Sequence, residues 1–444
     1  MAEGHQAAGA LSYGELFRTF GKIGLINFGG PAGQIALMHR VLVDEKRWID
    51  EAGYLRALNF CTLLPGPEAQ QLATYIGWRL MGARGGLTAG LLFIGPGAVV
   101  ILLLSILYAY AANVKPVSAA LLGVKAAVLA IVVEALLRVA RRALNGRLKL
   151  AIALAAFLAL FAFQAPFPAV VLTAGLIGLL AAQIDPGLLK LKPAGPAPAP
   201  APLGPMIGKS LLTALAWAAL WAAPLLAVLL LFGRDHVLFQ IGLFFSKLAL
   251  VTFGGAYAVL AYMAQEAVSL HGWLRPGEMV DGLGLAETTP GPLIMVTEYV
   301  GFLAAFRAPA PFTPLLAGVI GAALTVWVTF APCFLWIFTG APFIERLEHA
   351  RRVQGALAAI TAAVVGVIAN LAVWFSLHVL FRSFAALRLG DVSVSLPVPA
   401  SLDWRAAGLS LVAAVLLLRL HAGVLKTLGV CILLGLGLHL AGLA

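Results

Sequence analysis

Residues that could bind an anion occur twice in this chain at the same spacing. Phe28-Gly29-Gly30 and Phe253-Gly254-Gly255 are related by a shift of 225 residues, from Phe28 to Phe253, and the same shift places Pro65-Gly66-Pro67 on Pro290-Gly291-Pro292. Proline removes a backbone donor and glycine weakens a helix interior, so each motif predicts a helix break. A broken helix presents unpaired N–H groups and a positive dipole end, and both favour a bound anion.

Charged side chains flank these motifs. Lys22 and Lys247 each lie six residues before a Phe-Gly-Gly motif, in otherwise apolar segments. A lysine inside a membrane usually faces a cavity or a partner, so we expect both near one anion pathway; the alternative is snorkelling to the interface, especially for Lys22. Glu68, Glu287 and Glu298 lie beside the Pro-Gly-Pro motifs. An ionised carboxylate repels an anion, so these groups could couple proton movement to transport; the alternative for Glu68 is a helix N-terminal residue that satisfies the dipole.

Polar side chains near the motifs, including Gln34 and Gln71, could line an oxyanion site or hydrogen-bond between helices. Glycine and proline are also common in membrane helices for packing reasons. Repetition in both halves favours a site, because repeat transporters bind substrate where broken helices meet. The predicted substrate-binding residues are Lys22, Asn27, Phe28, Gly29, Gly30, Pro65, Gly66, Pro67, Gln70, Lys247, Thr252, Phe253, Gly254, Gly255, Tyr257, Thr288, Thr289, Pro290, Gly291 and Pro292.

The composition is that of an all-α polytopic membrane protein. Of the 444 residues, 61% are hydrophobic and 11% are charged, against ~25% charged in soluble domains. The three cysteines are widely spaced and indicate neither a disulfide framework nor a metal site. We expect a lipid bilayer around the chain, no cofactor and no nucleic-acid partner. About thirteen apolar segments are predicted, at residues 17–38, 58–81, 86–110, 117–137, 148–164, 166–184, 210–232, 239–263, 283–305, 312–338, 353–379, 405–420 and 424–442.

Basic loops predict how these segments are oriented. Arginines and lysines crowd residues 138–149, after segment 117–137, and Arg346, Arg351 and Arg352 come before its counterpart 353–379. Basic loops are cytoplasmic, so the two halves should have inverted topology, with broken or re-entrant helices. The N-terminus is then cytoplasmic, and residues 382–404 and the C-terminus are periplasmic. We divide the chain into a first repeat (1–185), a Pro/Ala-rich cytoplasmic linker (186–209), an extra connecting helix (210–232) and a second repeat (233–444).

Lys125 lies within segment 117–137 and has no lysine counterpart in the second half, where the shift places Ala350. Glu134 follows it two to three turns later. We expect these two residues to form a structural pair.

The motifs resemble those of the chromate ion transporter family, in its long two-domain bacterial form. The resemblance rests on Phe28-Gly29-Gly30-Pro31, on residues 63–71 (LLPGPEAQQ), on residues 252–257 (TFGGAY) and on residues 288–292 (TTPGP). It covers nearly the whole chain. It implies export of chromate across a bacterial inner membrane and chromate resistance, with sulfate as a similar oxyanion and a second copy of the chain as a candidate partner. Asn27 and Pro31 are replaced by Thr252 and Ala256 in the second half, so the site should be asymmetric.

Two other classes of function remain open. No GxxxxGK[ST] motif is present, so transport should be secondary. An importer or exchanger of sulfate or another tetrahedral oxyanion would share every feature above. A membrane oxidoreductase, such as a chromate reductase, would need a flavin, haem or metal site, and the sequence shows no motif for one. We therefore predict a transporter and not an enzyme.

Overall fold

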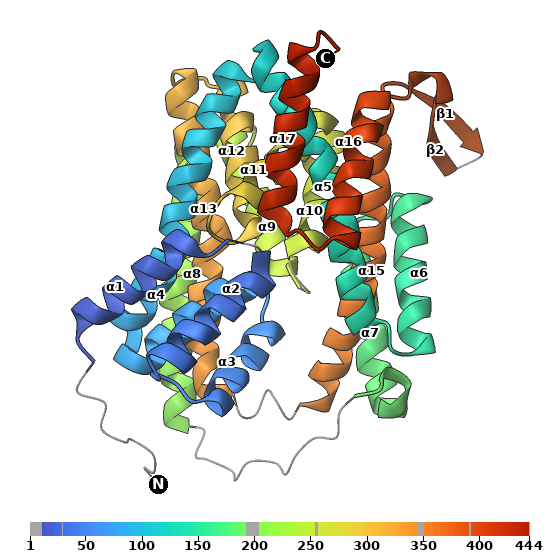
Figure 1. Cartoon of the computed structure of the whole chain (residues 1–444). Coiled ribbons are helices and arrows are strands. Elements are labelled where there is room, and N and C mark those ends of the chain that lie inside the picture. Colours follow the sequence, from blue (N-terminus) through green and yellow to red (C-terminus); the bar gives the residue numbers. More distant parts are fainter. Residues whose placement is uncertain are drawn as a thin grey trace.

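The computed structural model describes residues 11–28, 30–191, 204–253, 256–344, 350–389 and 392–443. Gly29, Gly254, Gly255, Arg346 and residues 192–203 of the predicted linker lie outside the described residues. The described chain is almost entirely helical, as predicted (Figure 1). The exception is an antiparallel hairpin of β1 (Phe384–Leu389) and β2 (Val392–Pro397), which lies within the predicted periplasmic stretch 382–404.

Every segment that carries a repeated motif is broken in the structure. The predicted segment 17–38 is two helices separated at residues 27–29, and segment 58–81 is interrupted at Pro65-Gly66-Pro67. The elements of the first repeat are α1 (Tyr13–Ile26), α2 (Gly30–His39), η1 (Arg40–Glu45), α3 (Glu51–Leu63), α4 (Glu68–Ala111), α5 (Lys115–Ala143), α6 (Arg147–Phe161), α7 (Phe167–Ile184) and η2 (Pro186–Leu189). Helix α4 has non-helical backbone angles at Met81 and Gly82, which agrees with the predicted boundary between segments 58–81 and 86–110.

The second repeat follows the same order after the connecting helix α8 (Gly204–Phe232). In segment 239–263 one helix ends at Val251 and the next begins at Ala256, and segment 283–305 is interrupted between Thr288 and Leu293. Its elements are α9 (Val237–Val251), α10 (Ala256–Ala264), η3 (Gln265–Leu270), α11 (Pro276–Thr288), η4 (Leu293–Met295), α12 (Val296–Arg307), α13 (Pro314–Gly340), η5 (Ala341–Phe343), α15 (Arg351–Leu380), η6 (Pro399–Ser401), α16 (Trp404–Ala414), η7 (Val415–Arg419) and α17 (Val424–Leu440).

The predicted number of thirteen membrane segments is not confirmed. Within the described ranges, 6 helices are long and apolar enough to cross a membrane. The four motif-bearing segments do not form continuous spans, because glycine and proline interrupt them. The six helices are Glu68–Ala111, Lys115–Ala143, Phe167–Ile184, Ile207–Phe232, Pro314–Phe343 and Arg351–Leu380.

The inverted relation between the repeats is visible in the packing of α5 and α15, which occupy equivalent places in the two halves. Gly146, just after α5, lies beside Leu188 and Lys190 of the η2 region. Ala182, near the end of α7, packs on Gly355 at the start of α15. Helix α5 therefore ends at the end of the molecule where α15 begins, which is the lower end in Figure 1. The hairpin and the C-terminus lie at the upper end.

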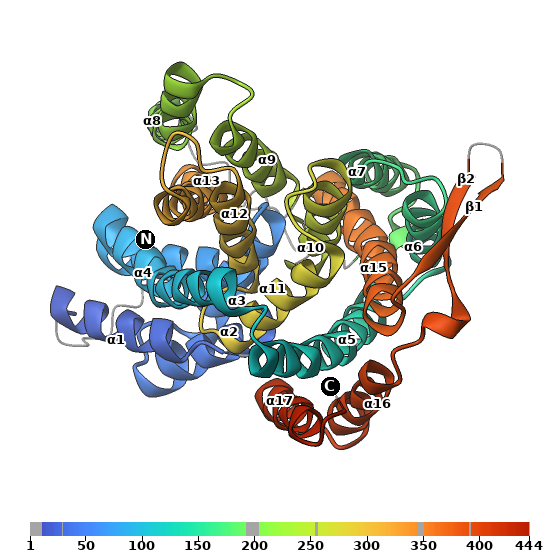
Figure 2. The same cartoon turned by 90° about the horizontal axis from the view of Figure 1, so that it is seen from above.

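Helices α10 and α11, which border the breaks of the second repeat, occupy the middle of the molecule, whereas α1 lies at its edge (Figure 2). Figure 2 shows α10 and α11 near the centre of the view from above, with α6, α8, α16 and α17 toward the periphery. Glycines allow close packing around this centre. A Cβ atom at Gly301 of α12 or at Gly321 of α13 would overlap atoms of the opposite helix. The peripheral helices expose many leucines, as expected for surfaces that face lipid.

Candidate functional site

The two repeats are joined at the centre by a pair of crossed backbone hydrogen bonds. The Gly66 N–H donates to the Thr252 carbonyl at 2.8 Å, and the Gly291 N–H donates to the Asn27 carbonyl at 3.4 Å. Asn27 and Thr252 are the C-caps of α1 and α9. The shift of 225 residues that relates Phe28 to Phe253 also exchanges these two bonds. Each Pro-Gly-Pro break is therefore held by the Phe-Gly-Gly break of the other repeat.

Glycine is required at the tips of both Pro-Gly-Pro breaks. Gly66 has φ +123° and Gly291 has φ +107°, a conformation that L side chains rarely adopt. A Cβ atom at Gly66 would also lie 2.9 Å from Sγ of Cys333. Gly30, the first residue of α2, has φ +69°. All three positions therefore use the conformational freedom of glycine.

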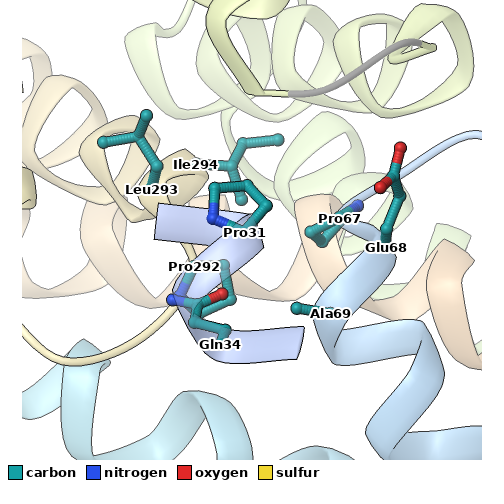
Figure 3. A pocket seen from close by; sticks show the side chains of 8 residues that line it. All are labelled: Pro31, Gln34, Pro67, Glu68, Ala69, Pro292, Leu293 and Ile294. Atoms are coloured by element: carbon teal, nitrogen blue, oxygen red, sulfur yellow. The ribbon is translucent and has the colours of Figure 1, made fainter. Parts of the chain in front are cut away.

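A cavity lies where the breaks meet, and we call it the central cavity. Its volume is about 20 Å³, which is room for about one water molecule, so the lining residues must move apart to admit an oxyanion. Its lining comes from both repeats: Pro31, Gln34, Pro67, Glu68, Ala69, Pro292, Leu293 and Ile294. Figure 3 shows Pro31 between Ile294 and Pro67.

Three helix beginnings converge on the central cavity. Helix α2 begins at Gly30, α4 begins at Glu68, and η4 leads into α12 from Leu293. The N-caps of α4 and η4 are Pro67 and Pro292, and neither makes a side-chain capping bond. The first amide groups of a helix have no intrahelical acceptor. The cavity wall therefore offers N–H donors and positive dipole ends from both repeats, which suit an oxyanion.

Buried amide side chains surround the breaks of the first repeat. Gln34 donates from Nε2 to the carbonyls of Asn27 at 3.1 Å and Gly291 at 2.5 Å, so it bridges the two repeats. Gln71 donates to the Pro65 carbonyl at 2.7 Å. The side-chain oxygens of Asn27, Gln34, Gln70 and Gln71 are buried without a partner among the described residues. A buried polar atom without a partner is costly, so these atoms are available to a water molecule or a protonated ligand.

The three predicted carboxyl groups occupy different places. Glu68 lines the central cavity, and its carboxyl group points away from Gln34 (Figure 3). Glu287 accepts a hydrogen bond of 2.7 Å from the Tyr257 hydroxyl and lines a second, narrower space together with Thr289 and Gly291. Glu298 is buried, and its Oε2 has no partner in the described part of the chain. The shift places Leu293, Thr62 and Ala73 opposite these three acids. The site is thus chemically asymmetric, as predicted.

Several predicted residues do not contact the cavity. Lys22 and Lys247 have exposed side chains and are absent from the lining of both spaces. The hydroxyls of Thr252, Thr288 and Thr289 donate to carbonyls within or at the ends of their own helices. The sequence also missed four lining residues that contribute mainly backbone or apolar surface. These residues are Pro31, Ala69, Leu293 and Ile294. The feature of the sequence that could have identified them is their position directly beside the breaks.

Broken helices from two inverted repeats that meet around a buried cavity define a transporter of the inverted-repeat class. The family described as chromate transporter matches residues 14–179 and 239–438. The chromate transport protein of Pseudomonas aeruginosa is 35% identical over 81% of this chain and 80% of its own length. The chain therefore belongs to the chromate transporter family, as its motifs indicate, and this is a family of transporters and not of enzymes.

Two further relatives have similar coverage. The probable chromate transport protein of Synechococcus elongatus is 28% identical over 81% of this chain and 84% of its own length. The chromate transport protein of Cupriavidus metallidurans is 27% identical, over 80% of each chain. No solved structure gives a significant match.

Proposed function

We propose that this protein exports chromate from the cytoplasm across a bacterial inner membrane and thereby confers chromate resistance. The observation that supports this most strongly is the central cavity, whose lining includes the first residues of helices from both repeats. A tetrahedral dianion needs N–H donors from several directions. The named relatives are chromate transport proteins, and they supply the identity of the anion.

In this proposal the membrane potential drives export. A negative-inside potential favours outward movement by about 2.3 kcal/mol per charge per 100 mV, and so by roughly twice that for a dianion. The lower end in Figure 1 is then cytoplasmic, because it carries the basic residues around 138–149 and 351–352. The hairpin and the C-terminus face the periplasm.

In this mechanism Glu68 is the residue that binds a proton. No lysine or arginine is among the residues that line the central cavity, and Glu68 is the only acid among them. An ionised carboxylate repels a dianion, so anion binding and protonation of Glu68 favour each other. A proton would then move with the anion. The pair carries one net negative charge, and the potential still favours its export by about 2.3 kcal/mol per 100 mV.

Import or exchange of sulfate is the alternative. Amide N–H groups recognise shape and charge, which chromate and sulfate share, and the lining residues contain no group that would separate them by chemistry. Discrimination must therefore be measured directly.

The test is anion flux in proteoliposomes, with the potential and the pH gradient imposed separately. We expect the potential to drive chromate, with sulfate competing at higher concentration, and we expect expression to lower the chromium content of chromate-exposed cells. Sulfate flux without chromate flux would establish the alternative. No flux of either anion above that of empty liposomes would overturn the proposed function.

A further inference from the structure

An ion pair between a half-buried lysine and a buried aspartate joins the two repeats outside the central cavity. Nζ of Lys125, on α5, lies 3.2 Å from Oδ2 of Asp281, on α11. The hydroxyl of Tyr108, on α4, donates to the same oxygen at 2.8 Å. Asp281 is 2% exposed, and its Oδ1 has no hydrogen-bond partner in the described ranges. The expectation that Lys125 pairs with Glu134 is wrong, because Glu134 pairs with Arg138 one turn away.

The ion pair lies on the helix that leads to the site. Asp281 is on α11, whose Ala286 and Glu287 line the smaller space beside the central cavity. Gly277, Asp281 and Gly284 recur at helical spacing and face α5. A Cβ atom at Gly277 would lie 3.2 Å from Nζ of Lys125, and one at Gly284 would lie 3.5 Å from Cβ of Val124. Helices α5 and α11 are therefore in close contact along this stripe.

The ion pair must break if α5 and α11 separate. The two helices belong to different repeats, and relative movement of the repeats is how such transporters expose a central site to each side. Removing the partner of a buried charge leaves that charge uncompensated, at a large cost in free energy. An oxyanion moving past Lys125 would replace the negative charge of Asp281, and Asp281 would keep the hydroxyl of Tyr108 as a donor. No lysine or arginine lines the central cavity, so an anion path through the molecule needs a cation elsewhere, and Lys125 supplies one against α11.

We propose that Lys125 is an anion-binding residue on the path between the central cavity and the end of the molecule where α4 ends and α5 begins, and that Asp281 occupies Lys125 when no anion is there. This inference rests on the proposed oxyanion transport. In this inference Asp281 competes with the anion for Lys125. Loss of Lys125 should therefore weaken anion binding, whereas loss of the Asp281 charge should not.

Equilibrium binding of chromate to the purified protein, together with flux in proteoliposomes, tests this competition. Lys125→Gln should raise the half-saturating chromate concentration at least ten-fold. Asp281→Asn should leave it unchanged or lower it, and the double variant should behave like Lys125→Gln. Lys209→Gln is the control, because Lys209 is exposed on the connecting helix α8 and makes no ion pair with a described residue. Lys125→Arg preserves the charge and should recover part of the affinity if Lys125→Gln folds poorly.

The outcomes separate the inference from the function on which it rests. If Lys125→Gln and Asp281→Asn both lower thermal stability but leave the half-saturating concentration unchanged, or shift it in the same direction, the ion pair is structural and the inference fails. Failure of Lys125→Arg to recover affinity in a folded protein also counts against it. If the wild-type protein moves neither chromate nor sulfate, the proposed function itself fails.

A disulfide between α5 and α11 provides a second test. The 3.5 Å separation of Cβ at Val124 from a Cβ at Gly284 lies within the range for disulfides. Oxidised Val124→Cys/Gly284→Cys protein should lose flux, and reduction followed by removal of the reductant should restore it. The native cysteines Cys61, Cys333 and Cys431 are buried, and Val124→Cys alone is the control. Wild-type flux through fully cross-linked protein would show that α5 and α11 need not separate.

Discussion

The breaks of the two repeats have the same backbone and different side chains. Gly66 and Gly291 share a positive φ and the same crossed hydrogen bond. Around them, the first repeat places Gln34, Gln70 and Gln71 where the shift gives Val259, Met295 and Val296 in the second. Repetition has therefore preserved the broken backbone, while the amide side chains around it have diverged.

The largest effects should come from the shared backbone. Gly66→Ala and Gly291→Ala each force a side chain into a positive-φ conformation that costs roughly 1–3 kcal/mol, and each disturbs a bond between the repeats. We expect chromate flux to fall by about ten-fold or more in both, with protein still present in the membrane. Gly30→Ala should behave similarly, and we predict the same for Gly255→Ala. Gly14→Ala, at an uncrowded glycine in α1, is the control.

Equal losses at Gly66 and Gly291 support a shared backbone site. Full activity of Gly66→Ala with loss at Gly291, or the reverse, would show that only one repeat binds the anion.

Among the side chains that differ between the repeats, substitution of Glu68 should have the next largest effect on transport. Glu68→Gln keeps the shape but removes the titrating group from the central cavity. We expect chromate binding by the wild-type protein to weaken as pH rises, because ionised Glu68 repels the dianion, and we expect Glu68→Gln to remove most of that dependence. Binding isotherms at several pH values measure this. Glu287→Gln makes the same change at an acid of the second repeat, for comparison. An unaltered pH dependence of chromate binding in Glu68→Gln would exclude Glu68 as the proton site.

The repeated lysines should have a smaller effect. We propose that Lys22 and Lys247 act near the anion pathway by long-range attraction, since both side chains are exposed. Lys→Gln at either position should raise the half-saturating chromate concentration by about three-fold or less, and only at low salt, because salt screens exposed charges. A ten-fold change that persists at high salt would indicate that these lysines contact the anion directly. No change at low salt would make them interfacial anchors.

The smallest effect on transport should occur at the periphery. Asp403, outside the membrane-spanning segments, caps α16 and contacts Arg382 at 2.6 Å and Arg405 at 3.3 Å. Burial alone would raise the pKa of Asp403, but these hydrogen bonds outweigh it and lower the pKa to about 2. Its stabilising effect is therefore present above the usual aspartate pKa and is lost as pH falls toward 2.

Asp403→Asn should lower thermal stability at neutral pH by roughly 1 kcal/mol, the usual size of a capping interaction. It should leave chromate flux near the wild-type value. A large loss of flux in folded Asp403→Asn protein would show that the hairpin region takes part in transport.

Sequence predicted the repeated architecture because the repeated features are local. Glycine and proline predict helix breaks wherever they occur, and the structure confirms the breaks at residues 65–67 and 290–292. Partner choice across the repeats was not predictable from spacing. Lys125 lies on the same helix as Glu134 but pairs with Asp281, which is distant in sequence. The sequence also did not identify Ala69, Leu293 and Ile294 as lining residues. These residues line the cavity because of where their backbone lies, and the type of a residue does not reveal that.

The most direct test of the account is an experimental structure determined with chromate bound. We predict a tetrahedral anion in the central cavity, within hydrogen-bond distance of the first amide groups of α4 and of the η4–α12 segment, contacted by both repeats. Gly66→Ala protein should lack that anion under the same conditions. An ordered chromate bound elsewhere, or contacted by one repeat alone, would contradict the claim that the crossed breaks form the substrate site.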